Sequence, residues 1–222
     1  MSIPDNLRKL QSETPDHVSI IAVSKRKSVE DILEAYNAGH RVFGENRVQE
    51  LIEKQPLLPG DIQWHMVGHL QSNKVKYLAG FVDLIHSVDS LKLLQTIDRE
   101  ALKNERVISC LLQVHISDEE SKFGLTGDEL PEMVGSPDFQ SLNNIRIAGV
   151  MGMATFTQDM EKVGSEFRYL KKVFANLKEK YFSEDPDFRE ISMGMSGDYK
   201  LAIEEGSTMI RLGTIIFGPR NY

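Results

Sequence analysis

Short apolar runs alternate with longer amphipathic segments along the whole chain. Eight runs predict strands, at 18–24, 41–44, 62–67, 84–87, 107–115, 145–151, 190–193 and 208–212. Helical spacing of apolar residues predicts helices between them, among others over 28–38, 90–104 and 160–181, and one more over 5–12. This order is typical of repeated βα units around a parallel sheet.

Eight βα repeats are the number that closes a barrel. We therefore predict an α/β fold, a single (β/α)8 TIM barrel with an extra N-terminal helix over 5–12, and expect residues 1–222 to form one domain. That helix should lie outside the barrel or across its bottom. An open doubly wound sheet is the main alternative, because the same units build it. In a barrel, functional groups gather where the strands end.

Composition indicates a soluble globular protein. The chain has 222 residues, 41% of them hydrophobic and 27% charged, and no apolar stretch approaches the roughly 20 residues that cross a bilayer. No basic start followed by an apolar core marks the N-terminus for export, so we expect a cytoplasmic protein without a membrane partner. The net charge of −7 argues against a nucleic-acid partner. Cys110 lies in an apolar run and is interpreted as a buried structural thiol.

Lys25 ends the apolar run 20–24, at the place where a barrel carries active groups. Side chains alternate across a strand, so Lys25 should share the inward face with Ile21 and Val23. Partial burial and the neighbouring Arg26 and Lys27 would both lower its pKa, which favours a nucleophilic amine that can form an imine. A lysine that merely ends a strand and reaches water is an equally good interpretation of this segment alone.

Arg211 lies in the last predicted strand, where alternation directs it inward with Met209 and Gly213 and directs Ile210 and Leu212 toward the helices. A buried guanidinium is costly unless an anion or an acceptor meets it. Arg211 is therefore a candidate binding residue.

Two glycine-containing segments near the last two strands suit a phosphate group. They contain Ser196, followed by Gly197, and Gly213, followed by Thr214. We expect Ser196 to cap a helix whose free N–H groups attract an anion. Loops after strands seven and eight often bind phosphate in such barrels, although any single glycine commonly serves a tight turn.

Further polar groups follow the second and third strands. Asn46 should lie on the same rim as Lys25, as should the segment that contains His65 and His69. The two histidines are four residues apart but straddle a strand end, so no metal site is predicted. His17 and His40 are expected to face solvent. The charged loop around 119–124 shows no legible chemistry.

These segments, in this order, resemble the family of pyridoxal 5′-phosphate (PLP) homeostasis proteins, which are related to the barrel domain of alanine racemase. The resemblance covers nearly the whole chain and rests on the segments 22–25, 43–46, 64–65, 68–74, 86–89, 120–124, 151–153, 193–196 and 211–213. It implies a barrel like the N-terminal domain of alanine racemase. It also implies that Lys25 forms a Schiff base with PLP, Arg211 approaches the pyridine nitrogen, Asn46 lies beside the ring, and Ser196, Gly213 and Thr214 hold the phosphate.

The resemblance, together with the groups present, favours a carrier of PLP over an enzyme. Arginine cannot act as an acid toward the ring nitrogen, so the ring should stay unprotonated and be a weak electron sink. Because the sequence stops at Tyr222, we expect no counterpart of the second domain that supplies a tyrosine base in the racemase. We expect a monomer that binds PLP and releases it by transimination, with PLP-dependent apo-enzymes as receivers. A PLP-dependent racemase-like enzyme and a Schiff-base aldolase for a phosphorylated substrate are the alternatives.

Overall fold

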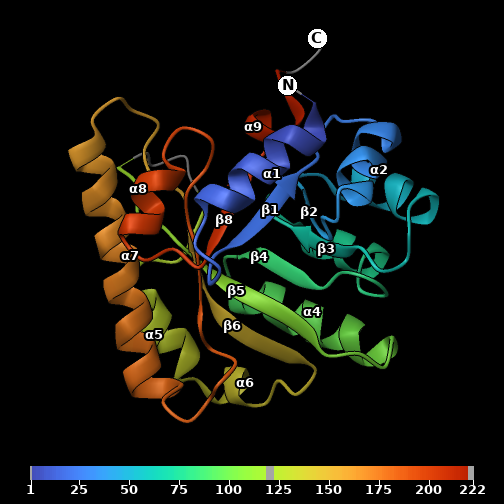
Figure 1. Ribbon diagram of the computed structural model, residues 1–222. Helices are drawn as coiled ribbons and strands as arrows, with labels where there is room; N and C mark the ends of the chain where they lie inside the picture. Colours follow the sequence, from blue (N-terminus) through green and yellow to red (C-terminus); the bar gives the residue numbers. More distant parts are fainter. Residues whose placement is uncertain (1, 119–122, 220–222) are drawn as a thin grey trace.

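Eight parallel strands close into a barrel in their sequence order, β1 to β8. The computed structural model describes residues 2–118 and 123–219, and Figure 1 shows the barrel with its surrounding helices. The strands are β1 Ser19–Val23, β2 Val42–Glu45, β3 Gln63–Met66, β4 Leu84–Val88, β5 Ile108–Val114, β6 Ile145–Gly152, β7 Glu190–Ser192 and β8 Met209–Leu212. The barrel prediction is therefore confirmed, and the open sheet is wrong, since β1 pairs with β8.

Helical segments connect the strands in the described part of the chain. The α-helices are α1 Ile3–Glu13, α2 Val29–Asn37, α3 Val48–Lys54, α4 Leu91–Lys103, α5 Glu129–Val134, α6 Pro137–Gln140, α7 Met160–Tyr181, α8 Tyr199–Glu204 and α9 Thr214–Phe217. Two 3-10 helices, η1 Gln55–Leu57 and η2 Ser72–Tyr77, lie on either side of β3. The connection between β3 and β4 thus contains a 3-10 helix in place of an α-helix.

The extra N-terminal helix is present as α1. Ser2 caps it, because its hydroxyl accepts the N–H of Asp5 while the Asp5 carboxylate accepts the N–H of Ser2. α1 contacts α2 and α9 on the outside of the barrel, and the Asn6 side chain donates to the carbonyl of Ile216 at 2.9 Å. The first and last helices of the described chain are joined in this way.

The core has two layers, as alternation along each strand requires. One layer lies inside the barrel and consists of Ile21, Val23, Val67, Leu84, Leu111, Ala148, Met151 and Met209. The larger layer lies between strands and helices and includes Ala22, Ile210 and Leu212. The inward direction predicted for Arg211 follows, because it alternates with Ile210 and Leu212.

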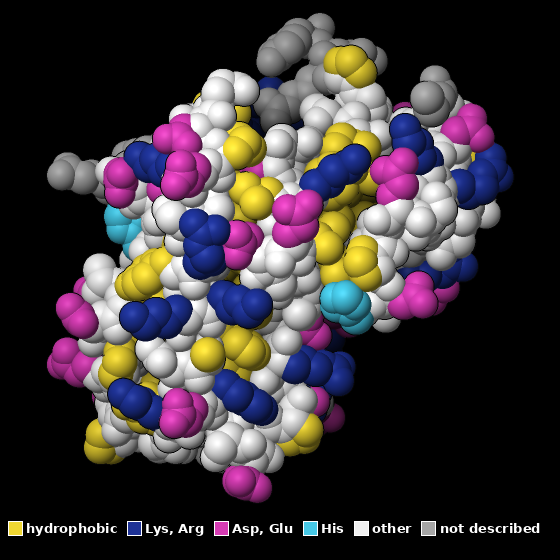
Figure 2. Space-filling model, turned by 60° about the vertical axis from the view of Figure 1, so that its left-hand side comes forward, with side chains coloured by type: hydrophobic (Ala, Val, Ile, Leu, Met, Phe, Trp, Pro, Cys, Tyr) yellow, Lys and Arg dark blue, Asp and Glu magenta, His cyan; other side chains and the backbone are white. Residues whose placement is uncertain are grey.

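The surface carries charges of both signs. On the face of the molecule that contains α7, Lys and Arg side chains are interspersed with Asp and Glu, and apolar side chains occur in small groups between them (Figure 2). Of the helices that the structure describes, none combines the length and the apolar character needed to span a bilayer.

Candidate functional site

A cavity of about 290 Å³ lies at the C-terminal ends of the strands. It brings together all six residues singled out from the sequence: Lys25, Asn46, Ser196, Arg211, Gly213 and Thr214. They come from segments that follow β1, β2 and β7, from β8 itself and from the start of α9. The other lining residues are Val23, Val67, Met153, Phe156, Met195, Gly197 and Asp198.

Lys25 lies in the turn between β1 and α2 and is half-buried. It continues the inward alternation of β1 and lines the cavity together with Val23. Its neighbour Arg26 has φ 59°, in the left-handed region that residues other than glycine seldom adopt. The Lys27 ammonium donates to the carbonyls of Phe217 and Gly218 at 2.9 and 3.4 Å. Both features fix the chain on the C-terminal side of Lys25.

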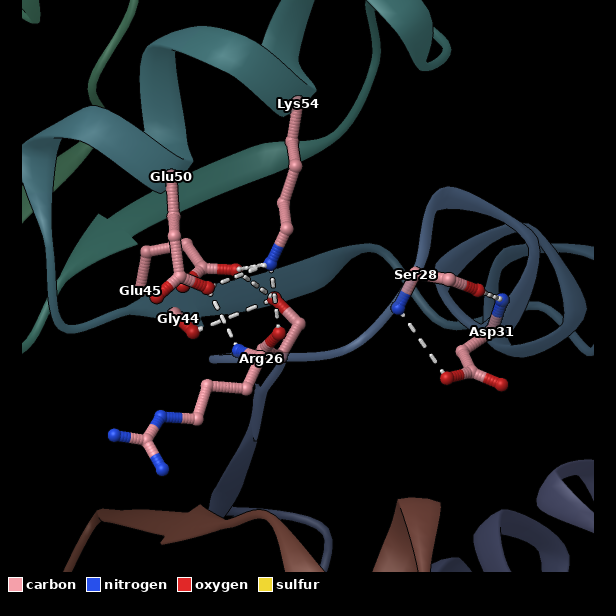
Figure 3. A network of polar contacts seen from close by, with 8 residues as sticks. Arg26, Ser28, Asp31, Gly44, Glu45, Glu50 and Lys54 are labelled. Atoms are coloured by element: carbon pink, nitrogen blue, oxygen red, sulfur yellow. Dashed lines mark hydrogen bonds and ion pairs between the residues drawn. The ribbon is translucent and has the colours of Figure 1, made fainter. Parts of the chain in front are cut away.

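A buried ionic group lies against this turn, between the barrel and α3 (Figure 3). The Lys54 ammonium donates to Glu45 Oε1 at 2.8 Å, to Glu50 Oε2 at 3.1 Å and to the carbonyl of Ser24 at 2.9 Å. Ser24 Oγ donates to Glu45 Oε1 at 2.7 Å, and the N–H of Arg26 donates to Glu50 Oε2 at 2.7 Å. We call Glu45, Glu50 and Lys54 the carboxylate–lysine cluster.

The two carboxyl groups of the cluster differ in their environment. Glu45 is fully buried, which raises its pKa, although Lys54 and Ser24 oppose the shift. Its Oε2 has no hydrogen-bond partner among the described residues. Burial also acts upward on the pKa of Glu50, but the hydrogen bonds from the Arg26 N–H and from Lys54 outweigh it and lower that pKa. Glu50 is accordingly the more firmly ionised member.

Arg211 is only 5% exposed, and its guanidinium reaches two acceptors inside the barrel. Nη1 donates to Ser192 Oγ at 2.6 Å and Nη2 donates to the carbonyl of Gly152 at 3.0 Å. Burial lowers the pKa of Arg211 to about 10, while the charge of Asp198 raises it. Arg211 therefore remains a cation at neutral pH and lines the cavity with a fixed orientation.

Ser192 links Arg211 to two histidines that sequence reasoning left without a role or did not single out. His86 Nδ1 lies 2.9 Å from Ser192 Oγ, and His86 Nε2 lies 3.0 Å from His65 Nδ1. Both imidazoles are buried. We call His65, His86 and Ser192 the histidine–serine chain. Its members come from β3, β4 and β7, so only the closed barrel brings them together.

Arg211 fixes one role in this chain. Because a guanidinium can only donate, Ser192 Oγ accepts from it and keeps a proton and a lone pair for His86 Nδ1. With one proton on each ring, the hydrogen bond between His86 Nε2 and His65 Nδ1 can run in either direction. Burial lowers the pKa of His65 to about 3. Burial, with the positive charges that His65 and Arg211 can carry, lowers the pKa of His86 well below its usual value, so both rings are neutral at neutral pH.

Asn46 and Gly68 are tightly fitted on the rim of the cavity. A Cβ at Gly68 would lie 2.3 Å from the Asn46 carbonyl oxygen, so a glycine is needed there. Asn46 Oδ1 is buried and has no hydrogen-bond partner among the described residues. A buried acceptor without a partner beside a cavity suits a ligand that brings a donor.

The segment after β7 differs from the expectation that Ser196 caps a helix. The residue that precedes α8 is Asp198, and no side chain caps this short helix. The intervening residues form a turn in which Asp198 Oδ1 accepts the N–H of Met195 at 2.5 Å and the Asp198 N–H donates to the carbonyl of Met195. Ser196 belongs to this turn and lines the cavity through it, so the capping prediction is wrong.

The segment after β8 fits the expectation of a close backbone approach. A Cβ at Gly213 would lie 3.2 Å from the carbonyl oxygen of Val23, a tight contact. Thr214 begins α9 directly after it and lines the cavity. Gly213 thus lets β8 turn into α9 close to the end of β1.

The other histidines are arranged as follows. His40 is buried, with Nε2 2.8 Å from the carbonyl oxygen of Val42, so the prediction that it faces solvent is wrong. His17 is exposed, as predicted. His69 lies 3.3 Å from Asp89 and stacks on Phe123. In residues 2–118 and 123–219 no three His, Cys, Asp or Glu side chains are grouped as metal ligands.

Two of the sequence interpretations concern other parts of the chain. Cys110 is buried in β5, and burial raises the pKa of its thiol, as expected of a structural cysteine. Residues 119–122 of the charged loop lie outside the described residues. Met153 and Met195 line the cavity, a role that residue type alone did not indicate.

Comparison with known proteins relates the whole chain to one group. Residues 2–221 match the family model described as "Alanine racemase, N-terminal domain". A pyridoxal phosphate homeostasis protein from Aquifex aeolicus is 40% identical over 91% of this chain and 87% of its own length. The Escherichia coli K12 protein of the same name is 36% identical over 94% of this chain and 88% of its own length.

Solved structures give the same relation. The structure of PipY from Synechococcus elongatus PCC7942 with PLP bound is 39% identical, has a TM-score of 0.88 and is matched over 98% of this chain and all of the other. Alanine racemase from Bartonella henselae has a TM-score of 0.72 at 17% identity, which shows a shared fold only. The present chain covers 60% of that racemase.

Proposed function

Because the chain belongs to the family of pyridoxal phosphate homeostasis proteins, we propose that it binds PLP covalently through Lys25 and releases it to other amines. The observation that carries this proposal is the single cavity that joins Lys25, Arg211, Asn46 and the segments containing Ser196 and Gly213. Bound PLP would supply an aldehyde, which condenses with an amine to a Schiff base and water.

In this proposal Lys25 is the amine that attacks the aldehyde. Its place at the inward end of β1 directs its side chain into the cavity, and Val23 and Val67 line the cavity beside it. The neutral amine is the nucleophilic form of a lysine side chain.

The segments that contain Ser196 and Gly213 would receive the phosphate. Ser196 and Thr214 provide hydroxyl donors, and Gly213 allows the backbone to come close to the ligand. Asn46 would lie beside the pyridine ring, where its Oδ1, which has no hydrogen-bond partner among the described residues, could accept a hydrogen bond from the ligand. These assignments also explain why polar groups from distant segments meet at one rim.

Arg211 would face the pyridine nitrogen as a fixed donor. Its pKa of about 10 keeps the guanidinium charged at neutral pH, so it donates a hydrogen bond without giving up its proton. A ring that is not protonated withdraws electrons weakly. The geometry therefore supports a carrier that exchanges amines by transimination and is not an enzyme.

We further propose where and with which partners the protein acts. It would deliver PLP to PLP-dependent apo-enzymes, be located in the cytoplasm and act as a monomer. The word homeostasis in the names of the relatives agrees with storage and delivery of the cofactor.

Titration with PLP tests the proposal directly. Wild-type protein should develop the absorbance of an imine, and Lys25→Ala should lose it completely while its circular dichroism remains unchanged. Lys27→Ala is the matched control, because Lys27 lies two residues away with its ammonium bonded to backbone carbonyls. Imine absorbance retained in Lys25→Ala, or racemisation of amino acids at enzyme-like rates, would contradict the proposal.

A further inference from the structure

The carboxylate–lysine cluster holds the backbone on both sides of Lys25. On the N-terminal side, Ser24 gives its hydroxyl proton to Glu45 and accepts a hydrogen bond from Lys54 on its carbonyl. On the C-terminal side, the N–H of Arg26 donates to Glu50. Figure 3 shows Glu45, Glu50 and Lys54 converging on this short stretch from β2 and α3.

The cluster does not itself line the cavity. Ser24 alternates with Lys25 and is fully buried on the side of α3, while Lys25 faces the interior of the barrel. The cluster and the cavity are thus on opposite sides of the same strand end. Glu45, Glu50 and Lys54 are not among the residues that line the cavity, but they contact the turn that carries Lys25 and can influence a ligand through it.

Because the carboxylate–lysine cluster is buried, it is not expected to contribute much to the stability of the fold. Glu45 is fully buried and Lys54 is 8% exposed, and a buried ion pair commonly contributes less stability than apolar side chains of the same size. Arg26 adds the cost of a left-handed conformation. Backbone strain that surrounding side chains maintain is often found where a functional group must be fixed.

We propose that Lys54, Glu45 and Glu50 are positioning residues for Lys25, which fix the turn so that its amine is presented to the aldehyde. This inference rests on the proposed attachment of PLP to Lys25. Small displacements of a reacting group lower its rate strongly, so loosening the turn should slow formation of the covalent adduct. It should do so without changing the groups that line the cavity.

The test is the rate at which PLP becomes trapped on Lys25 by borohydride, measured by peptide mapping over time. Glu50→Ala removes the acceptor for the Arg26 N–H, and we expect a slowing on the order of tenfold or more. Glu50→Gln keeps an acceptor oxygen and should restore most of the rate. Asp98→Asn is the control, because Asp98 also accepts two backbone N–H groups, those of Asn143 and Asn144, at the start of β6.

A double variant separates positioning from stability. Lys54→Met combined with Glu45→Gln removes both charges of the buried pair, which should leave a folded barrel, yet Ser24 loses the donor to its carbonyl. We expect this protein to melt near the wild type and to form the adduct slowly. Wild-type rates in the double variant and in Glu50→Ala, or equal slowing by Asp98→Asn, would overturn the positioning role alone. An adduct on a different lysine in the wild type would overturn the proposed function and, with it, this inference.

Discussion

Two clusters of buried polar side chains lie beside the cavity, and they satisfy their buried polar atoms in different ways. The carboxylate–lysine cluster lies between barrel and helices, contains full charges and pairs them. The histidine–serine chain lies inside the barrel behind Arg211 and keeps both imidazoles neutral. Each group fixes one cation-forming residue of the cavity, Lys25 in the first case and Arg211 in the second.

The difference follows from which side of a strand each residue occupies. Ser24 and Glu45 share the outward side of β1 and β2, where the long side chain of Lys54 reaches them from α3. His65, His86, Ser192 and Arg211 face inward, and the hydrogen-bond partners that the structure describes for their side chains all lie on strands. The interior therefore depends on hydrogen bonds between strands, and the layer outside can use ion pairs.

Removing one charge of the cluster should have the largest effect on stability. Lys54→Met leaves the fully buried carboxylate of Glu45 without its cation, which should lower the free energy of unfolding by about 3–5 kcal/mol. Urea denaturation followed by circular dichroism measures this change. The added Glu45→Gln substitution should recover most of it, and a double variant as unstable as Lys54→Met would contradict the account.

Interrupting the histidine–serine chain should lower the free energy of unfolding by less than Lys54→Met does. His86→Leu leaves Ser192 and His65 without one partner each, and a buried polar group without a partner costs about 1–3 kcal/mol. The same denaturation experiment applies, with the exposed His17→Leu as control. A loss as large as that in Lys54→Met would show that the chain carries charge in the folded protein.

The stability of the folded protein should fall at low pH because its buried histidines are neutral. The folded pKa of His65, about 3, lies below the unfolded value of 6.5, so the unfolded chain binds more protons as the pH falls. The contribution is fully present above pH 6.5 and is lost as the pH decreases toward 3, by about 2 kcal/mol at pH 5 for this one residue. His65→Gln should flatten the stability profile between pH 6.5 and 5. If stability changed equally with pH in the wild type and in His65→Gln, His65 would not be held neutral by the fold.

The smallest effect is expected at Arg26. Glycine adopts the left-handed conformation without strain, so Arg26→Gly should stay within about 1 kcal/mol of the wild type, despite the greater freedom of glycine in the unfolded chain. The Arg26 N–H still reaches Glu50 in this variant. A loss above about 2 kcal/mol would mean that the Arg26 side chain contributes to the cluster.

Much of this picture could be predicted from the sequence because alternation along a strand is a local property. It predicted the inward direction of Arg211, which the burial pattern around β8 confirms. The other candidate residues of the cavity came from their places after strand ends and from the family resemblance. The barrel followed from counting the repeats.

The remaining features depend on contacts that no local pattern records. The histidine–serine chain needs three strands, β3, β4 and β7, to bring its members together, and the cluster needs a lysine from α3 to reach back to Ser24 at the end of β1. Ser196 precedes a glycine and an aspartate that form a turn before α8, so a capping residue was assigned too early. His40 is buried, with its ring edge-on to Phe43 and its Nε2 2.8 Å from the carbonyl oxygen of Val42.

The central claim is that Lys25 is the residue to which PLP becomes attached. Reduction of the PLP-treated protein with borohydride, followed by peptide mapping, tests it most directly, because the reduced bond survives digestion. We predict one modified peptide, with the pyridoxyl group on Lys25. A modified lysine elsewhere, with Lys25 unmodified, would contradict it.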